Sequence, residues 1–270
     1  MADRGPAIGI FDSGVGGLTV FAQVAQRLPA ESIVYLGDTA RVPYGTKSGD
    51  TVLRYAIGCT DVLVARGIKM LVVACNTASA YALDVLPEHL DMPVLGVIEP
   101  GAKRAVELSR RGRIGVIGTA STIASRAYDK AILRMAPNAK VFSKPCPLFV
   151  PLAEEGWVEG PVPRQVAAAY LDELLQNDID TLVLGCTHYP LLKDIIAETA
   201  GTDVVLVDSA EATSQAVADT LAGLSLEREQ KGPPEYSFLV TDAPGNFGRI
   251  GERFLGRPIS PIEWVDVSNA

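Results

Sequence analysis

The sequence is poor in the side chains that bind metal ions or nucleic acids. It has 2 histidines and 4 cysteines in 270 residues, and it contains no Cys-x-x-Cys pair. A zinc site would therefore need an unusual set of ligands. The net charge of −8 argues against a general nucleic-acid or anionic-membrane binder, because such partners attract a basic surface. We expect a small-molecule ligand and no metal.

Long apolar runs and targeting signals are also missing. No run approaches the ~18 apolar residues of a membrane-spanning helix. The stretch "MADRGPAIGIFDSG" lacks the basic and apolar regions of a secretory signal. We therefore expect a cytoplasmic protein without disulfides, since cytoplasmic thiols stay reduced. This expectation covers Cys59, Cys75, Cys146 and Cys186.

Short β-rich runs alternate with segments of helical period. A hydrophobic share of 48% is enough for a folded core in one large domain or two small ones. The runs expected to form strands are 7–11, 32–38, 70–75, 93–98, 113–118, 140–145, 181–186, 203–208 and 236–242. Helical patterns between them include 18–28, 51–67 and 163–176. The alternation predicts an α/β fold with a mostly parallel sheet covered on both faces. Ligands of such sheets bind beyond the carboxyl ends of the strands.

Two pairs of segments resemble each other. Residues 8–24 and 114–131 each read as a strand that breaks into small and hydroxyl residues before a helix. The strand ends "VVACNT" and "VLGCTH" match likewise, and each contains a cysteine. These matches suggest a duplicated chain whose similar halves face each other across one cleft.

The glycine-rich segment "DSGVGGLT" admits two interpretations. Gly14 and Gly16 are spaced as at the start of a dinucleotide-binding loop, and Asp38 ends the next strand where a ribose-binding acid would lie. However, Thr19 occupies the third glycine position, and the charge of Asp12 would oppose a pyrophosphate. The simpler interpretation is a tight turn between a strand and a helix.

Polar residues gather where the strands are expected to end. Asp12 is suited to bind an ammonium group, and Ser13 with nearby backbone N–H groups is suited to bind a carboxylate. Residues 75–77 and 187–189 add donors near helix N-termini, which favour anions. The combination predicts a small zwitterionic ligand.

The cysteines fall into two classes. A free cysteine is usually a core residue, and we interpret Cys59 and Cys146 in this way. Cys75 and Cys186 instead end their strands beside polar residues and near helix N-termini. Because a thiolate is stabilised in such surroundings, these two are the candidates for chemistry.

Several segments occur in order and with ordinary spacing between residues 8 and 210. They read "IGIFDSGVGG", "GDTARVPYG", "VVACNTAS", "GVIEPG", "GVIGTAST", "CPLFVPLAEEG", "LVLGCTHYPLL" and "VDSA". With these segments the chain closely resembles the glutamate racemases of the cofactor-independent aspartate/glutamate racemase superfamily. The resemblance implies interconversion of L- and D-glutamate without a cofactor, in support of peptidoglycan synthesis.

The resemblance also implies roles for individual residues. Cys75 and Cys186 would act on opposite faces of the substrate α-carbon, Cys75 on the D isomer and Cys186 on the L isomer. Asp12 and His188 would assist the proton transfers. The positions that match substrate contacts are Asp12, Ser13, Tyr44, Gly45, Asn76, Thr77, Thr119, Thr122, Thr187 and His188. Glu154 matches an acid near the second cysteine, although its neighbour Glu155 leaves that match ambiguous by one residue.

The same resemblance implies two pseudo-symmetric three-layer α/β domains with mostly parallel sheets and the active site between them. The first would comprise residues 1–97 and 209–270, and the second residues 98–208. A homodimer is expected from the family. No lysine lies in a motif that suggests pyridoxal phosphate; Lys47, Lys69 and Lys103 stay open as alternatives.

Two alternatives remain open at this level. The same scaffold could racemise aspartate or a related acid. A noncatalytic amino-acid-binding protein would also need the cleft, but it would have no reason to keep two thiols at matching strand ends.

Overall fold

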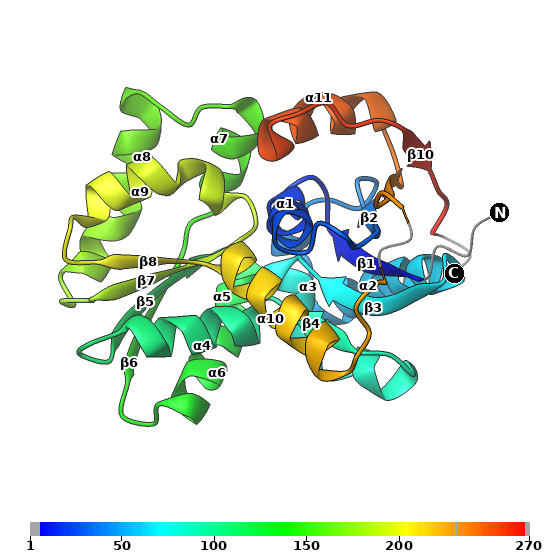
Figure 1. Ribbon diagram of the computed structural model, residues 1–270. Helices are drawn as coiled ribbons and strands as arrows, with labels where there is room; N and C mark the ends of the chain where they lie inside the picture. Colours follow the sequence, from blue (N-terminus) through cyan, green and yellow to red (C-terminus); the bar gives the residue numbers. More distant parts are fainter. Residues whose placement is uncertain (1–5, 230–231, 268–270) are drawn as a thin grey trace.

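Two parallel sheets form the framework of the chain (Figure 1). The structure is a computed structural model that describes residues 6–229 and 232–267. The first sheet contains β1 (Ala7–Asp12), β2 (Ile33–Gly37), β3 (Ile68–Val73), β4 (Val94–Gly96), β9 (Tyr236–Val240) and β10 (Ile262–Trp264). The second contains β5 (Arg113–Gly118), β6 (Lys140–Pro145), β7 (Thr181–Gly185) and β8 (Val205–Asp208). Every pair of neighbouring strands is parallel.

The second sheet repeats part of the first. The six-stranded sheet has the order β10-β9-β2-β1-β3-β4, and the four-stranded sheet has the order β6-β5-β7-β8. The order β6-β5-β7-β8 therefore matches β2-β1-β3-β4, with Cys75 following β3 and Cys186 following β7. This confirms the predicted α/β class with two pseudo-symmetric halves. All nine predicted strands are present, and β10 is an additional strand that the sequence did not predict. The domain boundaries after residues 97 and 208 stay a prediction.

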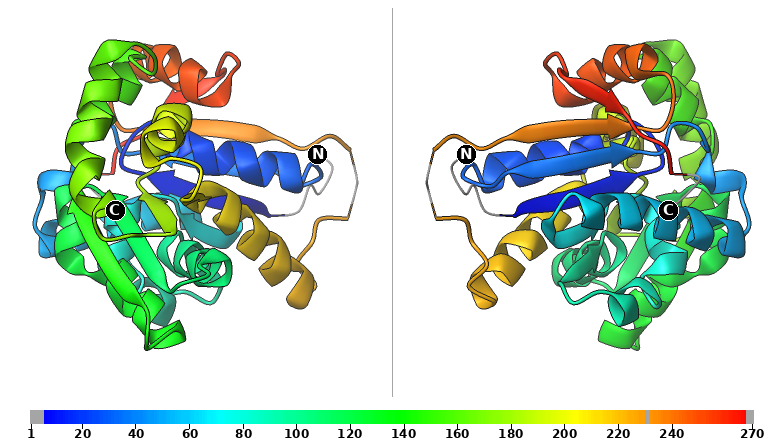
Figure 2. Two further views of the ribbon diagram at one scale, coloured as in Figure 1. Left: turned by 90° about the vertical axis from the view of Figure 1, so that its left-hand side faces the viewer. Right: turned by 90° about the vertical axis from the view of Figure 1, so that its right-hand side faces the viewer.

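The first sheet is built from both ends of the chain. In the right-hand view of Figure 2, the orange strand β9 lies beside the blue strands β2 and β1. The chain passes into the second half through α4 (Ile98–Leu108) and returns through α10 (Ser209–Gly223). The second sheet therefore forms from one continuous stretch of sequence.

Helices cover both faces of each sheet. Successive residues of a strand point to opposite faces, so each strand contributes apolar side chains to two buried clusters. In β1, Ile8 and Ile10 belong to one buried cluster and Phe11 to another. The first cluster includes side chains of α1, α10 and α11, and the second includes side chains of α2 and α3. In the second half, α4 and α6 pack on one face of the sheet, and α8 and α9 on the other.

The remaining elements complete the layers. The other helices are α1 (Leu18–Arg27), α2 (Gly49–Ala65), α3 (Asn76–Ala82), α5 (Ala120–Ser125), α6 (Ala127–Met135), α7 (Phe149–Glu155), α8 (Pro161–Leu175), α9 (Lys193–Ala200) and α11 (Pro244–Leu255). Short 3-10 turns lie at Tyr44–Thr46, Leu86–His89 and Tyr189–Leu192. Within the described ranges, no helix is both long and apolar enough to cross a membrane.

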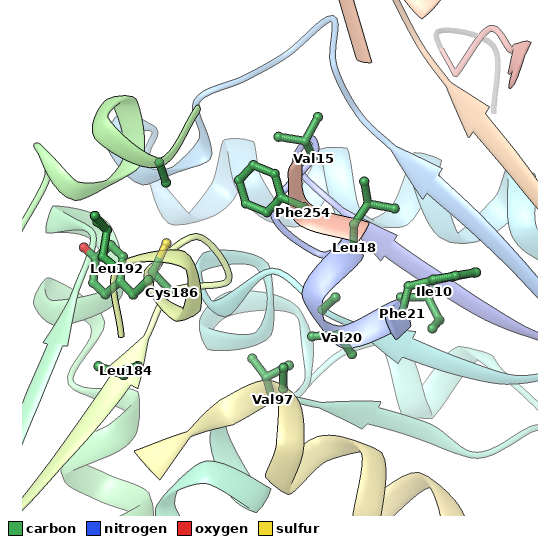
Figure 3. Close-up of a cluster of buried hydrophobic side chains, with 14 of the residues drawn as sticks. Ile10, Val15, Leu18, Val20, Phe21, Val97, Leu184, Cys186, Leu192 and Phe254 are labelled. Carbon is green, nitrogen blue, oxygen red and sulfur yellow. The ribbon is translucent and has the colours of Figure 1, made fainter. Parts of the chain in front are cut away.

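One hydrophobic cluster extends from the first half into the second (Figure 3). Leu18 and Val20 of α1 belong to the same cluster as Leu184 and Cys186 at the end of β7. Each fully buried aliphatic side chain contributes roughly 1.5–3 kcal/mol to folding. Pulling the halves apart would expose this surface, so the shared cluster holds the two sheets in a fixed relation.

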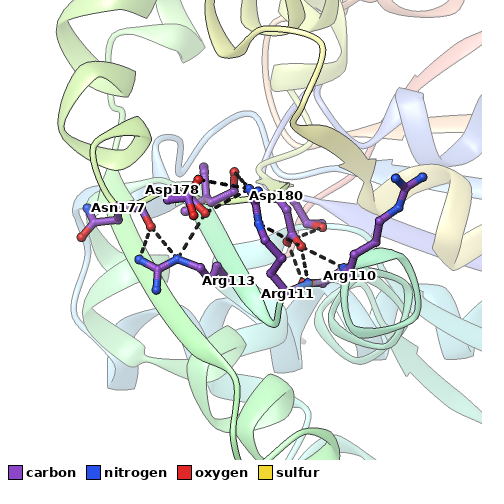
Figure 4. Close-up of polar contacts among 9 residues, drawn as sticks. Arg110, Arg111, Arg113, Asn177, Asp178 and Asp180 are labelled. Atoms are coloured by element: carbon purple, nitrogen blue, oxygen red, sulfur yellow. Dashed lines mark hydrogen bonds and ion pairs between the residues drawn. The ribbon is translucent and has the colours of Figure 1, made fainter.

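Asp180 ties together the amino ends of β5 and β7, at the edge of the sheet where the strands begin (Figure 4). Its Oδ1 atom accepts a hydrogen bond from the Ser109 hydroxyl at 2.7 Å. Its Oδ2 atom accepts from the backbone N–H groups of Arg110 at 2.8 Å and Arg111 at 2.5 Å. Burial alone would raise the pKa of Asp180, but these hydrogen bonds hold it below its ordinary value of 3.8. The carboxylate is therefore a structural acceptor.

We predict that Asp180→Ala lowers the free energy of unfolding by about 2–3 kcal/mol at neutral pH, because two backbone donors lose a charged acceptor. Because the folded-state pKa is lowered, this contribution is present above the ordinary value of 3.8 and is lost as the pH falls through the folded-state value. Urea unfolding at pH 7 and at pH 3 measures it. Asp172→Ala, on the exposed face of α8, is the control, with an expected change below about 0.5 kcal/mol. Equal losses in the two variants would contradict the assignment.

Candidate active site

The carboxyl ends of both sheets meet around one cavity of about 350 Å³. Its wall includes residues that follow β1 and β3 of the first sheet and residues that follow β5 and β7 of the second. The predicted site residues that line it are Ser13, Tyr44, Gly45, Cys75, Asn76, Thr77, Thr119, Glu154, Cys186, Thr187 and His188. Wider hollows, of about 430, 530 and 540 Å³, contain neither cysteine. The cavity of about 350 Å³ is therefore the candidate site.

Cys75 lies at the start of helix α3 on the first-half wall. Its sulfur accepts a hydrogen bond from the backbone N–H of Ala78 at 3.4 Å, which caps the helix. The thiol donates to the Ser13 hydroxyl at 3.7 Å. Burial raises the pKa of Cys75 to about 12, and the charge of Asp12 adds to that rise. The expected stabilisation of a thiolate at this helix N-terminus is outweighed, so Cys75 is a thiol at neutral pH.

Cys186 lies on the opposite wall in a row with a histidine and a carboxylate. Its sulfur is 3.8 Å from Nδ1 of His188, and Nε2 of His188 is 2.9 Å from Oε1 of Glu154. Burial lowers the pKa of His188, but the interactions with Cys186 and Glu154 raise it overall to about 10. His188 is therefore an imidazolium at neutral pH. Glu154 makes this contact, whereas the side chain of Glu155 is exposed.

Hydroxyl groups from both halves form a cluster at the cavity. The Oγ1 atoms of Thr77, Thr119 and Thr122 lie 3.0 Å from one another. The first belongs to the first half and the other two to the second, so the cluster crosses between the halves. Beside it, the carbonyl oxygen of the Asn76 side chain accepts a hydrogen bond from the Tyr128 hydroxyl at 2.7 Å.

Two predicted substrate contacts lie behind the cavity wall. Asp12 is fully buried at the end of β1, and its Oδ2 atom accepts from the backbone N–H of Gly14 at 3.0 Å. Its Oδ1 atom has no hydrogen-bond partner. Thr122 lies one turn into α5, behind Thr119. Neither lines the cavity, and the expected contact of Asp12 with an ammonium group stays a prediction. The interaction of Asp12 with Cys75 is electrostatic.

Two glycines allow close approach between the halves: Gly16 in the turn after β1 and Gly45 in the 3-10 turn Tyr44–Thr46. A Cβ atom on Gly16 would lie 2.3 Å from Oγ1 of Thr187 and 2.4 Å from Nδ1 of His188. A Cβ atom on Gly45 would lie 2.7 Å from Cβ of Thr119. No side chain fits at either position. The sequence predicted the tight turn. The structure shows that position 16 has no room for a side chain because the second half lies against it; the conformational freedom of glycine is not the reason.

Asp38 does not have the free carboxylate that the dinucleotide alternative requires. Its Oδ1 atom accepts from the Thr241 hydroxyl at 2.9 Å. Its Oδ2 atom accepts from the Tyr44 hydroxyl and from Nε of Arg41, the latter at 2.7 Å. Both oxygens are therefore used inside the first half. The carboxylate instead fixes Tyr44, which lines the cavity.

The sequence did not reveal the apolar part of the cavity or the aromatic side chain that supports His188. The wall also contains Val42, Pro147, Val150 and Pro151. The ring of Phe254, on helix α11, meets the ring of His188 edge to face, with centroids 5.3 Å apart. The quoted segment "CPLFVPLAEEG" contains both prolines and was the available signal. The contact between Phe254 and His188 joins residues that are far apart in the sequence, so no local sequence pattern indicates it.

The cavity does not gather the ligands of common cofactors. Its wall, as the described residues define it, contains no lysine, and Lys69 is instead paired with Glu31 at 2.6 Å. In residues 6–229 and 232–267 no three His, Cys, Asp or Glu side chains come close enough together to hold a metal ion. All the cysteines are free thiols.

Comparison with known proteins agrees with this geometry. The Asp/Glu/Hydantoin racemase family matches residues 8–217. A glutamate racemase of Geobacter metallireducens is 55% identical over 261 residues, with 97% of each chain covered. The crystal structure of glutamate racemase isoform RacE1 from Bacillus anthracis has a TM-score of 0.94 at 41% identity, covering 97% of this chain and 98% of that one. That of the Francisella tularensis glutamate racemase in complex with D-glutamate has a TM-score of 0.92 at 40% identity, covering 99% and 100%. The chain therefore belongs to the Asp/Glu/Hydantoin racemase family.

Proposed function

We propose that the protein interconverts L- and D-glutamate by moving the α-proton between Cys75 and Cys186. The observation that carries this proposal is that two thiols, one from each half, line the same cavity. Inversion of an α-carbon needs a base on one face and an acid on the other. Glutamate is the substrate because the relatives compared above are glutamate racemases, and one of them was crystallised with D-glutamate.

In the proposed resting enzyme Cys75 is the thiol and Cys186 carries the negative charge. The imidazolium of His188, 3.8 Å from the Cys186 sulfur, balances that charge. For L-glutamate, the Cys186 thiolate takes the α-proton as the Cα–H bond breaks and an S–H bond forms. Cys75 then gives its own proton to the other face of the carbon. The products are D-glutamate, a Cys75 thiolate and a Cys186 thiol, and the reverse reaction retraces these steps.

The new thiolate has donors ready on its own side. The backbone N–H of Ala78 already points at the Cys75 sulfur, and the Ser13 hydroxyl can turn to donate its proton. The carbanion between the two steps needs donors at its carboxylate. The unpartnered amide nitrogen of Asn76 and the hydroxyls of Thr77 and Thr119 are available for this. We assign these groups to substrate binding.

The cellular role is proposed from the family resemblance alone. D-glutamate made by this reaction would enter peptidoglycan synthesis and so support the cell wall and cell shape. A cytoplasmic location and a homodimer are part of the same proposal.

Replacing either active-site thiol should abolish racemisation. We expect Cys75→Ala and Cys186→Ala each to lower turnover about 10²–10⁴-fold or more, the usual contribution of a general acid or base. Circular dichroism of D- and L-glutamate, incubated separately with each variant, measures the rate. Cys59→Ala is the control, because that thiol is buried beside Arg41 and behind Tyr44 and does not itself line the cavity. Near-normal turnover by either active-site variant would rule out the two-thiol mechanism.

The two-base arrangement predicts where solvent deuterium appears. In heavy water one cysteine removes the α-proton, while the other, already exchanged with solvent, delivers deuterium to the opposite face. Early in the reaction the product enantiomer should therefore carry deuterium, and the remaining substrate almost none. Mass spectrometry of the separated enantiomers at low conversion measures both. Substantial label in unreacted substrate would indicate a single base instead.

Glu154 should set the alkaline limit of activity through His188. The pKa of His188 is raised to about 10, so its imidazolium is fully formed below the ordinary value of 6.5 and is lost as the pH rises through the folded-state value. Removing the charge in Glu154→Gln should move the alkaline limb of kcat/KM to lower pH by about one pH unit, equivalent to ~1.4 kcal/mol. Glu155→Gln, one residue away and exposed, should leave the profile unchanged. An identical alkaline limb in Glu154→Gln and the unaltered protein would disprove the role.

A further inference from the structure

Tyr128 makes a buried contact with the candidate site from the other half of the molecule. It lies on α6 of the second half, whereas Asn76 begins α3 of the first. Tyr128 is 2% exposed and Asn76 is 3% exposed. The Tyr128 hydroxyl is 2.7 Å from Oδ1 of Asn76. Asn76 lines the cavity, but Tyr128 does not.

This hydrogen bond determines which end of the Asn76 amide remains free. An amide side chain has an acceptor end and a donor end. The acceptor end of Asn76 is occupied by Tyr128, while its Nδ2 atom is buried without a hydrogen-bond partner. A buried donor left unpaired is energetically unfavourable. A ligand oxygen in the cavity would remove that cost.

Tyr128 is suited to act as a fixed donor. Burial raises the pKa of Tyr128, so the hydroxyl keeps its proton at neutral pH. The ring is also held in place. A Cβ atom on Gly185 would lie 3.0 Å from Cε2 of Tyr128, and one on Gly101 would lie 3.2 Å from its hydroxyl oxygen. The ring therefore packs closely against the end of β7 and against α4, which leaves it little room to turn.

We propose that Tyr128 is a positioning residue for the substrate: it holds the Asn76 amide so that Nδ2 donates to a carboxylate oxygen of the bound amino acid. The inference rests on the proposed function and adds to it a residue that does not touch substrate. Without the Tyr128 hydroxyl, the amide of Asn76 is free to turn its carbonyl oxygen toward the carboxylate. Two acceptors then face each other, and binding weakens.

A different interpretation treats the contact only as a link between the halves. Tyr81 provides the comparison, because it also joins them: its hydroxyl donates to the backbone carbonyl of Ser121 at 3.2 Å. Tyr81 is on α3 and Ser121 is on α5. The Ser121 hydroxyl also donates to the Tyr81 hydroxyl at 3.3 Å, so Tyr81→Phe removes two cross-half hydrogen bonds and none that Asn76 makes. It is therefore the matched control for Tyr128→Phe.

The test is a double-mutant cycle with Tyr128→Phe, Asn76→Ala and the combined variant. Tyr128→Phe should lower kcat/KM for glutamate about tenfold, mainly by raising KM, because the contact is made to bound substrate and transition state alike. In the Asn76→Ala background the same change should have almost no effect. Tyr81→Phe should leave both constants near those of the unaltered protein. Far-ultraviolet circular dichroism confirms that each variant is folded.

Two outcomes would overturn the assignment. One is an equal loss from Tyr128→Phe in the presence and absence of the Asn76 side chain, which would mean that Tyr128 acts independently of Asn76. The other is a comparable loss in Tyr81→Phe, which would mean that any cross-half bond matters. Titration calorimetry with D-glutamate on the same proteins requires no turnover. If the unaltered protein binds D-glutamate but does not racemise it, the proposed function fails while the binding cycle still decides the role of Tyr128.

Discussion

The site depends on how closely the backbone of one half approaches the other. At Gly16 the turn after β1 lies against Thr187 and His188 with no space for a Cβ atom. The hydroxyl of Thr19 donates to the carbonyl of Thr187 at 3.1 Å and fixes the same contact. A methyl group at Gly16 would push the two walls apart. This packing therefore sets how closely the wall that carries Cys75 lies to the wall that carries Cys186.

The fold is nearly symmetric, but the charges around the two sulfurs are not. Cys75 is buried, and its burial and the negative charge of Asp12 both raise its pKa. Cys186 instead faces the His188 imidazolium, which Glu154 holds. Negative charge on Cys186 also raises the pKa of Cys75, since like charges in one cavity disfavour each other. This repulsion disfavours negative charge on both sulfurs at once, and the mechanism proposed above needs it on only one of them.

The strands and the two cysteines could be predicted because their signals are local. Apolar runs of strand length end at Cys75 and Cys186, and parallel strands place such ends on one edge of a sheet. Strand β10 was missed because it has three residues with no buried side chain among them. The contacts of Tyr128 with Asn76 and of Phe254 with His188 depend on how distant helices pack. No spacing in the sequence indicates these contacts. Nor does the sequence indicate that Asp12 is fully buried and accepts a hydrogen bond from Gly14.

The path of the chain bears on how the protein is synthesised. All the strands of the second sheet lie between residues 113 and 208, so a nascent chain contains that sheet in full before it reaches α10. The first sheet begins earlier but ends later, because β9 and β10 come from residues 236–264. Until they emerge from the ribosome, β2 has an open edge that would attract other strands. The half that starts first is therefore the half that finishes last, and Phe254, which packs on His188 at the cavity, is supplied only when translation is almost complete.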